Sequence, residues 1–455
     1  MNAREIALGI LMDISENSNF SHTVMSRVLK QYQYLEKQDR ALITRICEGT
    51  VERMFTLDYI VNQYSGVKVN KMKPLIRNLM RMSVYQIKYM DQIPDSAACN
   101  EAVKLAKKRG FGNLSGFVNG VLRNVIRSPE KVIFPEENKD KIQYLSVVYS
   151  VPEWLVKHLL SQYGYTAVKR LLESSFQNKK TTIRCNTDKV TVEELIRLLK
   201  QNQVTVERGT YLPFALKIAD YNYLSDLGSF KKGYFLVQDE SSMLVGSVSG
   251  VKSGDAVIDV CAAPGGKSLH LAELLKSTGQ VDARDVSEGK INLIRDNIGR
   301  LGYVNIKTDM KDALQLDADS IDKADIVIAD LPCSGLGVIG KKPDIKYNMT
   351  PEKQQALVKL QREILSVVHQ YVKKGGILLY STCTVNKNEN IENVRWFLSQ
   401  YDFKLESIDD FLPPSLLCDT TKEGYIQLLP GSHDTDGFFI AKLRRNINKL
   451  ATNLI

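Results

Sequence analysis

Two cysteines of this 455-residue chain each follow a short apolar run that leads into a polar motif. Cys333 ends the sequence Asp-Leu-Pro-Cys that begins at Asp330, and Cys383 lies in the sequence Tyr-Ser-Thr-Cys-Thr. The apolar runs, 326–329 and 376–380, predict buried strands of an open α/β sheet. Because ligands of such sheets bind beyond the carboxyl ends of the strands, two thiols delivered there could meet in one site.

Two thiols in one site suit the methylation of cytosine at carbon 5. That carbon is a poor nucleophile, but a thiolate that adds to carbon 6 converts it into an enamine carbon able to attack an electrophilic methyl group. A proton must then leave carbon 5, and elimination frees the thiolate. Asp330, three residues before Cys333, could act as an acid near ring nitrogen 3. Spacing alone does not decide which thiol adds to the base.

The strongest local motif is the sequence Asp-Val-Cys-Ala-Ala-Pro-Gly-Gly-Lys, which ends at Lys267 between a predicted strand and a predicted helix. Its small residues would let a ligand approach the backbone amides at the helix N-terminus. A phosphate-binding P-loop would need glycine where Cys261 stands. A dinucleotide fingerprint would need a Gly-x-Gly-x-x-Gly spacing that this loop lacks.

Two carboxylates at the expected ends of the next strands could complete a site for an adenosine-containing cofactor. Asp285 is expected to end the second strand and to bind both ribose hydroxyls. Its alternative role is to cap the helix that begins near Ser287. Asp309 is expected to end the third strand and to accept a hydrogen bond from the adenine amino group, although aspartate is also common in loops.

From about residue 234 the chain alternates between strand and helix patterns, which predicts a doubly wound, mainly parallel sheet of the α/β class. The expected strands are 256–260, 280–286, 304–307, 325–329 and 376–380, and the expected helices are 267–275, 288–301 and 351–374. Gly375-Gly376 is expected to stop the last of these helices. A late strand at 437–441 is expected to be antiparallel, at or near the sheet edge.

The first part of the chain has a different character. Residues 1–130 show apolar residues at helical spacing and predict an all-helical domain. A polar stretch, 131–144, is expected to be a linker. Residues 145–233 then predict a small mixed module, with a strand at 181–186 and a helix at 192–199. This order suits an RRM-like or ferredoxin-like module, so residues 234–455 remain for the large sheet.

Charge is concentrated in the helical region. The formal net charge is +9, and residues 1–130 hold 19 Lys and Arg against 12 Asp and Glu. A basic module favours a polyanionic partner such as nucleic acid, although many soluble proteins are mildly basic without binding one. No stretch reads as a membrane span or as a signal-peptide core, so a cytoplasmic location is expected.

The other cysteines suggest no further chemistry. The seven cysteines include no close pairs, so neither a zinc site nor a disulfide framework is expected. Five of them are expected to pack in the interior and not to react: Cys47, Cys99, Cys185, Cys261 and Cys418.

Together these motifs resemble those of the RNA 5-methylcytosine methyltransferases that use S-adenosylmethionine. The match is most specific to the bacterial small-subunit methyltransferase B subfamily, also called Sun or Fmu, and it covers essentially the whole chain. Residues 1–130 resemble its NusB-like RNA-binding domain, including Asp39–Leu42 and Asn119–Asn124. Residues 238–242 resemble the segment before its cofactor loop, and Lys341–Asp344 resembles its basic loop after the Asp-x-Pro-Cys motif. The implied catalytic fold is a Rossmann-like methyltransferase domain.

The resemblance implies residue roles that spacing left open. Cys383 would be the nucleophile, Cys333 would assist release of the product, and Asp330 would face both base and cofactor. The implied S-adenosyl-L-methionine site comprises Cys261, Ala262, Ala263, Pro264, Gly265, Gly266, Lys267, Asp285, Asp309 and Asp330. The implied partner is 16S ribosomal RNA, no metal is required, and nothing calls for more than a monomer.

Two departures from the family pattern lie beside the implied site. Leu331 stands where alanine is usual, and Asn386–Asn390 replaces a Pro-Glu-Glu-Asn type of run. Neither removes a reacting group. Two other functions remain open: a transfer-RNA cytosine methyltransferase with the same core, and a non-catalytic RNA-binding assembly or antitermination factor. The second has no need of both thiols.

Overall fold

The computed structural model describes residues 2–17, 20–177 and 180–447, which divide into two compact units. Unit 1 takes its residues from Met1–Ser175 and Ile339–Met349, and unit 2 takes its residues from Phe176–Val338 and Thr350–Ile455. The boundary at Ser175 differs from the expected boundaries at 130 and 145. Residues 145–175 therefore lie with the N-terminal helices.

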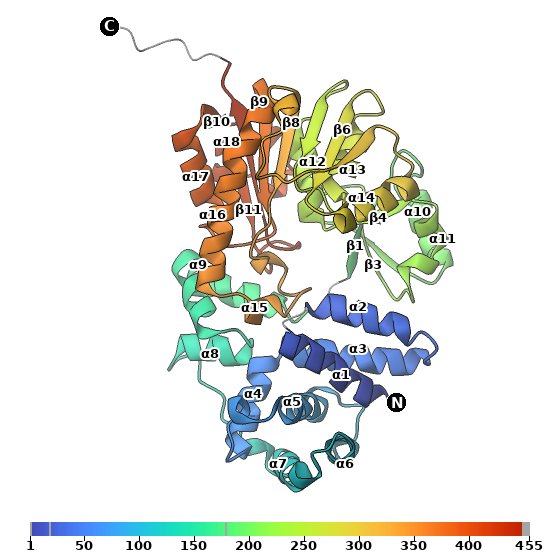
Figure 1. Cartoon of the computed structure of the whole chain (residues 1–455), viewed down its shortest axis with the longest axis vertical. Coiled ribbons are helices and arrows are strands. Elements are labelled where there is room, and N and C mark those ends of the chain that lie inside the picture. The colour runs from blue at the N-terminus through green and yellow to red at the C-terminus, as the bar shows by residue number, and fades with distance from the viewer. Residues whose placement is uncertain (1, 18–19, 178–179, 448–455) are drawn as a thin grey trace. The chain divides into compact units, whose positions relative to one another are not determined.

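Unit 1 is helical, as predicted (Figure 1). Its helices are α1 (Ala3–Asn17), α2 (Ser21–Gln31), α3 (Lys37–Glu52), α4 (Met54–Tyr64), α5 (Pro74–Tyr89), α6 (Asp95–Lys108), α7 (Ser115–Arg127), α8 (Lys141–Val148), α9 (Glu153–Ser174) and α15 (Ile345–Asn348). In α7, Val118, Val121, Leu122 and Val125 are all buried, at the spacing of one helix face. The expected linker is partly helical, because the Asp140 carboxylate caps the start of α8.

Unit 2 opens with a small antiparallel sheet covered by short helices. Its strands are β1 (Thr181–Cys185), β2 (Thr205–Arg208), β3 (Ala215–Ala219) and β4 (Phe235–Val237), in the order β2-β3-β1-β4. Its helices are α10 (Val192–Gln201) and α11 (Gly228–Lys231). Leu195 and Leu199 of α10 pack on Ile183 and Leu216 of the sheet. The mixed module of the sequence analysis is thus confirmed.

The large sheet of unit 2 has the order β10-β12-β9-β8-β5-β6-β7, with β11 paired to β12. The elements of this layer are α12 (Glu240–Ser249), β5 (Ala256–Asp259), α13 (Gly266–Leu274), β6 (Gln280–Asp285), α14 (Glu288–Leu301), β7 (Ile306–Met310), β8 (Ala324–Asp330), α16 (Pro351–Val368), β9 (Val372–Thr382), α17 (Ile391–Gln400), β10 (Phe403–Leu405), α18 (Asp419–Glu423), β11 (Tyr425–Leu428) and β12 (Phe438–Arg445). The strands from β9 to β7 are parallel, and β12 is antiparallel next to the edge strand β10, as expected.

The strand order reverses between β5 and β8. From β5 the chain continues outward through β6 and β7, and then returns to the other side of β5 with β8 and β9. Ligands of doubly wound sheets bind at such a switch point, beyond the carboxyl ends of the strands. The loops after β5, β8 and β9 are therefore the place to look for a site.

Both faces of this sheet are buried. In β8, Ile326 and Ile328 belong to a core shared with α12 and α13, whereas Val327 and Ala329 belong to a core shared with α16 and α17. The period-two alternation of the strand therefore supplies two cores, one on each side. This double burial makes β8 a rigid support for the residues that follow it.

One predicted boundary is wrong. Helix α16 ends at Val368 and not at residue 374, and Gly375 and Gly376 lie inside β9. The tertiary environment decides this: Val372 is fully buried, and Arg444 of β12 donates a hydrogen bond to the Gly375 carbonyl (2.5 Å). Pairing with β8, in which Val372 lies opposite Ala324, thus carries the strand back into residues whose local sequence favours a helix.

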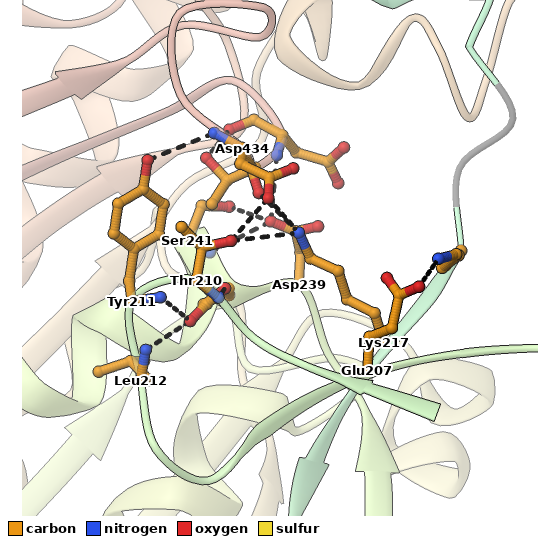
Figure 2. A network of polar contacts seen from close by, with 12 residues as sticks. Glu207, Thr210, Tyr211, Leu212, Lys217, Asp239, Ser241 and Asp434 are labelled. Carbon is orange, nitrogen blue, oxygen red and sulfur yellow. Dashed lines mark hydrogen bonds and ion pairs between the residues drawn. The ribbon is translucent and has the colours of Figure 1, made fainter. Parts of the chain in front are cut away.

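The first residue of α12 and the loop before β12 fasten the small sheet to the large one. The buried Glu240 carboxylate accepts hydrogen bonds from the backbone N–H groups of Thr210 (2.9 Å), Tyr211 (2.6 Å) and Leu212. Figure 2 shows Thr210 and Lys217 converging on Asp434, whose Oδ2 lies 2.6 Å from the Thr210 Oγ1. The turn between β2 and β3 is therefore held by carboxylates from the layer of the large sheet.

Replacing Glu240 by alanine should destabilise unit 2 by about 3 kcal/mol, because the backbone donors in the turn would lose their buried acceptor. Urea unfolding can be followed through Trp396 fluorescence in a Trp154→Phe background, which leaves a tryptophan reporter only in unit 2. Glu193→Ala, at an exposed position of α10, is the control and should leave the midpoint nearly unchanged. Equal effects of both substitutions would contradict this role of Glu240.

Candidate active site

A buried carboxylate at the end of β5 anchors the loop between β5 and α13. Asp259 is fully buried at the end of β5, and its Oδ2 accepts a hydrogen bond from the Ser268 Oγ (2.6 Å). Burial raises the pKa of Asp259 to about 7. Above the anchor, Gly265 takes a left-handed conformation (φ 101°). A Cβ there would approach Ile294 and Leu269 at 3.3 Å, so glycine suits this turn.

Asp285 ends β6, as predicted, and holds the same loop from the side. Its Oδ2 accepts the Ala263 N–H (3.0 Å), and its Oδ1 lies 3.0 Å from the Lys290 Nζ. The side chain is almost fully buried. Ser287 is the residue that occupies the N-cap position of α14, so helix capping does not account for Asp285.

Asp330, at the end of β8, joins three elements. Its Oδ2 lies 2.6 Å from the Nζ of Lys267, in the first turn of α13, and its Oδ1 accepts the Ser381 hydroxyl of β9 (2.8 Å). Burial alone would lower the pKa of Lys267, but Asp330 and Asp259 outweigh it and raise that pKa. The ammonium group, which also lies over the Phe438 ring, is thus a fixed positive charge beside Asp330.

The two thiols predicted to meet do meet. Cys333 follows β8 and Cys383 follows β9, and their sulfur atoms lie 3.4 Å apart. The pairing of β8 with β9 places Asp330 opposite Ser381, so both thiols leave the sheet at the same edge. The contact with Cys383, together with burial, raises the pKa of the Cys333 thiol well above its usual value. Cys333 therefore keeps its proton at neutral pH.

Glu389 supports the Cys333 loop and was missed by the sequence analysis. This fully buried carboxylate accepts the backbone N–H of Ser334 (2.8 Å) and its hydroxyl (2.5 Å). It also accepts the side-chain amides of Gln361 (3.1 Å) and Asn386 (3.0 Å). The available signal was a lone acidic residue in the run Asn386–Asn390, whose partners lie far away in sequence.

Sequence comparisons identify the family of this chain. A probable ribosomal RNA small subunit methyltransferase B of Bacillus subtilis is 37% identical over 98% of this chain and 99% of its own length. The chain belongs to the ribosomal RNA small subunit methyltransferase B family. It is therefore a methyltransferase, as the resemblance implied. A counterpart from Synechocystis is 32% identical over 98% of this chain and all of its own length.

Family models assign the parts of the chain in the same way. The model of the family described as 16S rRNA methyltransferase RsmB/F matches residues 249–444, and the NusB family model matches residues 1–127. A ferredoxin-like domain model of RsmF/B-like methyltransferases matches residues 151–222. The predicted fold class, a Rossmann-like methyltransferase preceded by a NusB-like region and a small α/β module, is confirmed.

Solved structures agree with this assignment. The crystal structure of PH0851 superposes with a TM-score of 0.82 at 28% identity, over 98% of this chain and 99% of that one. NSun6 from Pyrococcus horikoshii, solved with SFG, superposes with a TM-score of 0.59 at 27% identity, over 65% of this chain and 98% of that one.

Asp309 does not occupy the position expected for this methyltransferase fold. Strand β7 runs to Met310, so Asp309 lies inside the strand, where it pairs with Lys307 (3.3 Å). Met310 is the register partner of Asp285, and neighbouring strand residues face opposite sides, so Asp309 faces away from the side of Asp285. The first carboxylate beyond the strand end is Asp312.

The remaining cysteines divide by burial. Cys47, Cys99 and Cys185 are buried, as predicted, whereas Cys261 is partly exposed and Cys418 is exposed. The expectation that Cys418 packs in the interior is thus wrong. It directly precedes the short helix α18, and that position puts its side chain at the surface.

The described residues contain no group of three or more His, Cys, Asp and Glu side chains arranged to hold a metal ion. Within the same part of the chain, every helix is too short or too polar to cross a membrane.

The raised pKa of Asp259 predicts how the stability of unit 2 depends on pH. Unfolded aspartate ionises near pH 3.9, whereas the folded residue ionises near 7, so the native state loses stability as pH rises between these values. Asp259→Asn removes this loss of stability with pH, and the asparagine side chain can still accept the hydrogen bond from the Ser268 hydroxyl. Relative to the parent, the variant should gain free energy of unfolding from pH 4 to pH 7, by about 4 kcal/mol at most. Urea unfolding at several pH values measures the difference, and a pH-independent difference would contradict the prediction.

Proposed function

We propose that this protein transfers the methyl group of S-adenosylmethionine to carbon 5 of a cytosine in 16S ribosomal RNA, through a covalent bond between Cys383 and the base. The proposal is carried by the 3.4 Å contact of the two thiols beside the Asp330–Lys267 ion pair. The names of the relatives, which specify the small-subunit ribosomal RNA, support the substrate.

The loop after β5 suits S-adenosylmethionine, which supplies an electrophilic methyl group when bound. Residues Cys261 to Gly266 have small side chains, and the two glycines have none. They lead into the N-terminus of α13, where a ligand could approach the backbone. Asp285 stands at the end of the adjacent strand and would bind the ribose hydroxyls. Asp312 is the better placed of the two later carboxylates for the adenine amino group, because it lies beyond β7.

Cys383 is proposed to begin the reaction. Its thiolate adds to carbon 6 of the cytosine, and the electron pair of the carbon 5–carbon 6 double bond moves into the ring, which makes carbon 5 nucleophilic. Asp330 hydrogen-bonds the base, and Lys267 fixes the orientation of that carboxylate. The cytosine must first leave its stack, because its reacting carbons are poorly accessible within a helix.

Cys333 is proposed to assist release. After carbon 5 has gained the methyl group, it loses its proton to a base, and the electrons of that bond restore the ring double bond as the Cys383 sulfur departs. The leaving sulfur emerges beside the protonated Cys333 thiol, 3.4 Å away in the free enzyme. A hydrogen bond from the Cys333 S–H would stabilise the departing thiolate and disfavour its return to carbon 6.

A basic groove in unit 1 is suited to the RNA backbone. It lies between α6 and α7 and is lined by Asn100, Val103, Lys104, Lys107, Ser115, Gly116, Asn119 and Arg123. Its volume is about 490 Å³, and none of these lining residues is acidic. Cations and amides in this combination bind phosphodiesters without reading sequence, so the groove would hold RNA while the catalytic unit selects the base.

The reaction can be tested by trapping. Wild-type protein, labelled S-adenosylmethionine and unmethylated 16S ribosomal RNA should give label at carbon 5 of one cytosine. Cys383→Ala should lower the rate by more than about 10³-fold, because the nucleophile is lost. Cys333→Ala should accumulate a covalent protein–RNA band on denaturing gels, whereas Cys383→Ala should form none.

Other outcomes would redirect the proposal. Label on transfer RNA alone would change the substrate and keep the chemistry. Absence of label and of adduct, despite measurable binding of S-adenosylmethionine, would favour a non-catalytic assembly role. An adduct formed by Cys383→Ala would overturn the assignment of the nucleophile.

The cofactor carboxylates can be separated by matched substitutions. Asp285→Asn and Asp312→Asn should each weaken the binding of S-adenosylmethionine by about tenfold, the loss expected for one charge-assisted hydrogen bond. Asp309→Asn should leave the affinity unchanged, because Asp309 faces the other side of the sheet. Calorimetric titration with S-adenosylmethionine measures all three, and a larger effect at Asp309 than at Asp312 would restore the original assignment.

A further inference from the structure

The backbone around Cys333 is held from both sides by side chains of unit 2. Before the cysteine, the Pro332 carbonyl accepts a hydrogen bond from the Gln361 side-chain amide of α16 (2.9 Å). After it, Glu389 accepts the backbone N–H (2.8 Å) and the hydroxyl (2.5 Å) of Ser334. The Gln361 amide also donates to Glu389 (3.1 Å), so the two supports are themselves joined. The thiol is therefore carried by a backbone that is fixed on each side of it.

Gln361 and Glu389 are fully buried, which is unusual for an amide and a carboxylate. Their burial is tolerated because each has further partners: Gln361 accepts the Asn393 side-chain amide (2.8 Å), and Glu389 accepts that of Asn386 (3.0 Å). Apolar side chains of similar size could fill the same space without the cost of removing polar groups from water. The network therefore indicates a requirement for accurate position at this place and not only for packing.

The two thiol loops are joined to each other one residue beyond the sulfur atoms. Ser334 directly follows Cys333, and Thr384 directly follows Cys383. The hydroxyl oxygens of Ser334 and Thr384 lie 2.7 Å apart, next to the 3.4 Å contact of the two sulfur atoms. Because the Ser334 hydroxyl donates to Glu389, it can accept from Thr384. Glu389 therefore sets the spacing between the two loops.

The far end of the Cys333 loop is fixed by a close approach of two glycines. The Gly337 N–H donates to the Cys383 carbonyl (3.1 Å), and the Gly337 carbonyl accepts the Gly437 N–H (2.9 Å). A Cβ on Gly337 would lie 2.0 Å from the Gly437 oxygen, and a Cβ on Gly437 would lie 2.6 Å from the Gly337 Cα. Both positions therefore require glycine. Since Gly437 directly precedes β12, which pairs with β9, the loop is held against these strands.

We propose that Gln361 and Glu389 position Cys333 for the release step: by holding the backbone before and after it, they keep its thiol beside the sulfur of Cys383 as that sulfur departs from carbon 6. This inference rests on the proposed function, because it assigns both residues to the elimination. They are positioning residues, since they act through the backbone on either side of Cys333. All of these residues belong to unit 2.

Misplacement of Cys333 should affect elimination more than methyl transfer. The addition of Cys383 to the base and the attack of carbon 5 on the methyl group do not use the Cys333 thiol. The departing sulfur, in contrast, needs the Cys333 S–H within hydrogen-bond reach. A displacement of about 1 Å can slow a step that depends on such geometry by about 10²-fold. Loss of either support should therefore leave the methylated base attached to the enzyme.

The test uses the full-length protein with Gln361→Met and, as a second variant, Glu389→Gln. Gln361→Met keeps the length of the side chain and removes the amide donors, whereas Glu389→Gln turns one acceptor atom into a donor. With unmethylated 16S ribosomal RNA and S-adenosylmethionine, we expect the single-turnover rate of methyl transfer to stay within about threefold of wild type. Steady-state turnover should fall by about tenfold, with covalent protein–RNA adduct accumulating as in Cys333→Ala.

Glu273→Gln is the matched control. Glu273 is a buried carboxylate of unit 2 that accepts the Thr187 N–H (2.8 Å) and pairs with Arg184. These partners belong to β1 and to the turn after it. The control therefore reports the general effect of losing a buried carboxylate in this unit, and it should accumulate no adduct.

Three results would overturn the inference. They are wild-type turnover in both Gln361→Met and Glu389→Gln, an equal loss of the single-turnover and steady-state rates without adduct, or as much adduct in Glu273→Gln as in these variants. A lack of adduct in Cys333→Ala itself would instead overturn the proposed function.

Discussion

The parallel pairing of β8 with β9 is the constraint on which the rest of the site depends. Asp330 stands opposite Ser381 in this register, and the Ser381 hydroxyl bonds to the Asp330 carboxylate. Both strands are buried on their two faces, so neither can slide by one residue without moving a core side chain to the wrong side. Everything that follows the strand ends, including the 3.4 Å contact of the thiols, inherits this register. The switch point between β5 and β8 then brings Lys267 to the same carboxylate.

Buried polar groups keep the loops beyond the strands in one conformation. Glu389 accepts hydrogen bonds from a backbone amide, a hydroxyl and two side-chain amides, which use the acceptor positions of both oxygens. Glutamine could not replace it without turning one acceptor atom into a donor. Glu240 plays the same part for the small sheet. In each case a charge that would be costly to bury alone is matched by donors from segments distant in sequence, so the loop and its support form together.

The sequence could predict the residues whose positions follow from local pattern. Apolar runs that end in polar motifs located the ends of β5, β6, β8 and β9, and therefore both thiols. It could not predict what depends on tertiary pairing. Strand β7 runs three residues beyond its expected end at 307, so Asp309 lies within it, on the face opposite Asp285. Pairing of Val372 with Ala324 of β8 turns the expected end of α16 into the start of β9. The Glu389 partners Ser334 and Gln361 are likewise absent from any local window of the sequence.

The electrostatics of the thiol pair favour the roles that the resemblance assigned. Two sulfur atoms 3.4 Å apart in a buried setting cannot both carry a negative charge without strong repulsion, so ionisation of one thiol disfavours ionisation of the other. Glu389 lies on the Cys333 side, where its negative charge adds to burial and to the Cys383 contact in raising the pKa of Cys333. Ionisation of Cys333 is thus disfavoured, which supports the proposal that Cys383 supplies the thiolate while Cys333 keeps its proton as a hydrogen-bond donor. The Glu389 carboxylate that holds the Cys333 loop thus also disfavours ionisation of the Cys333 thiol, although less than burial and the Cys383 contact do.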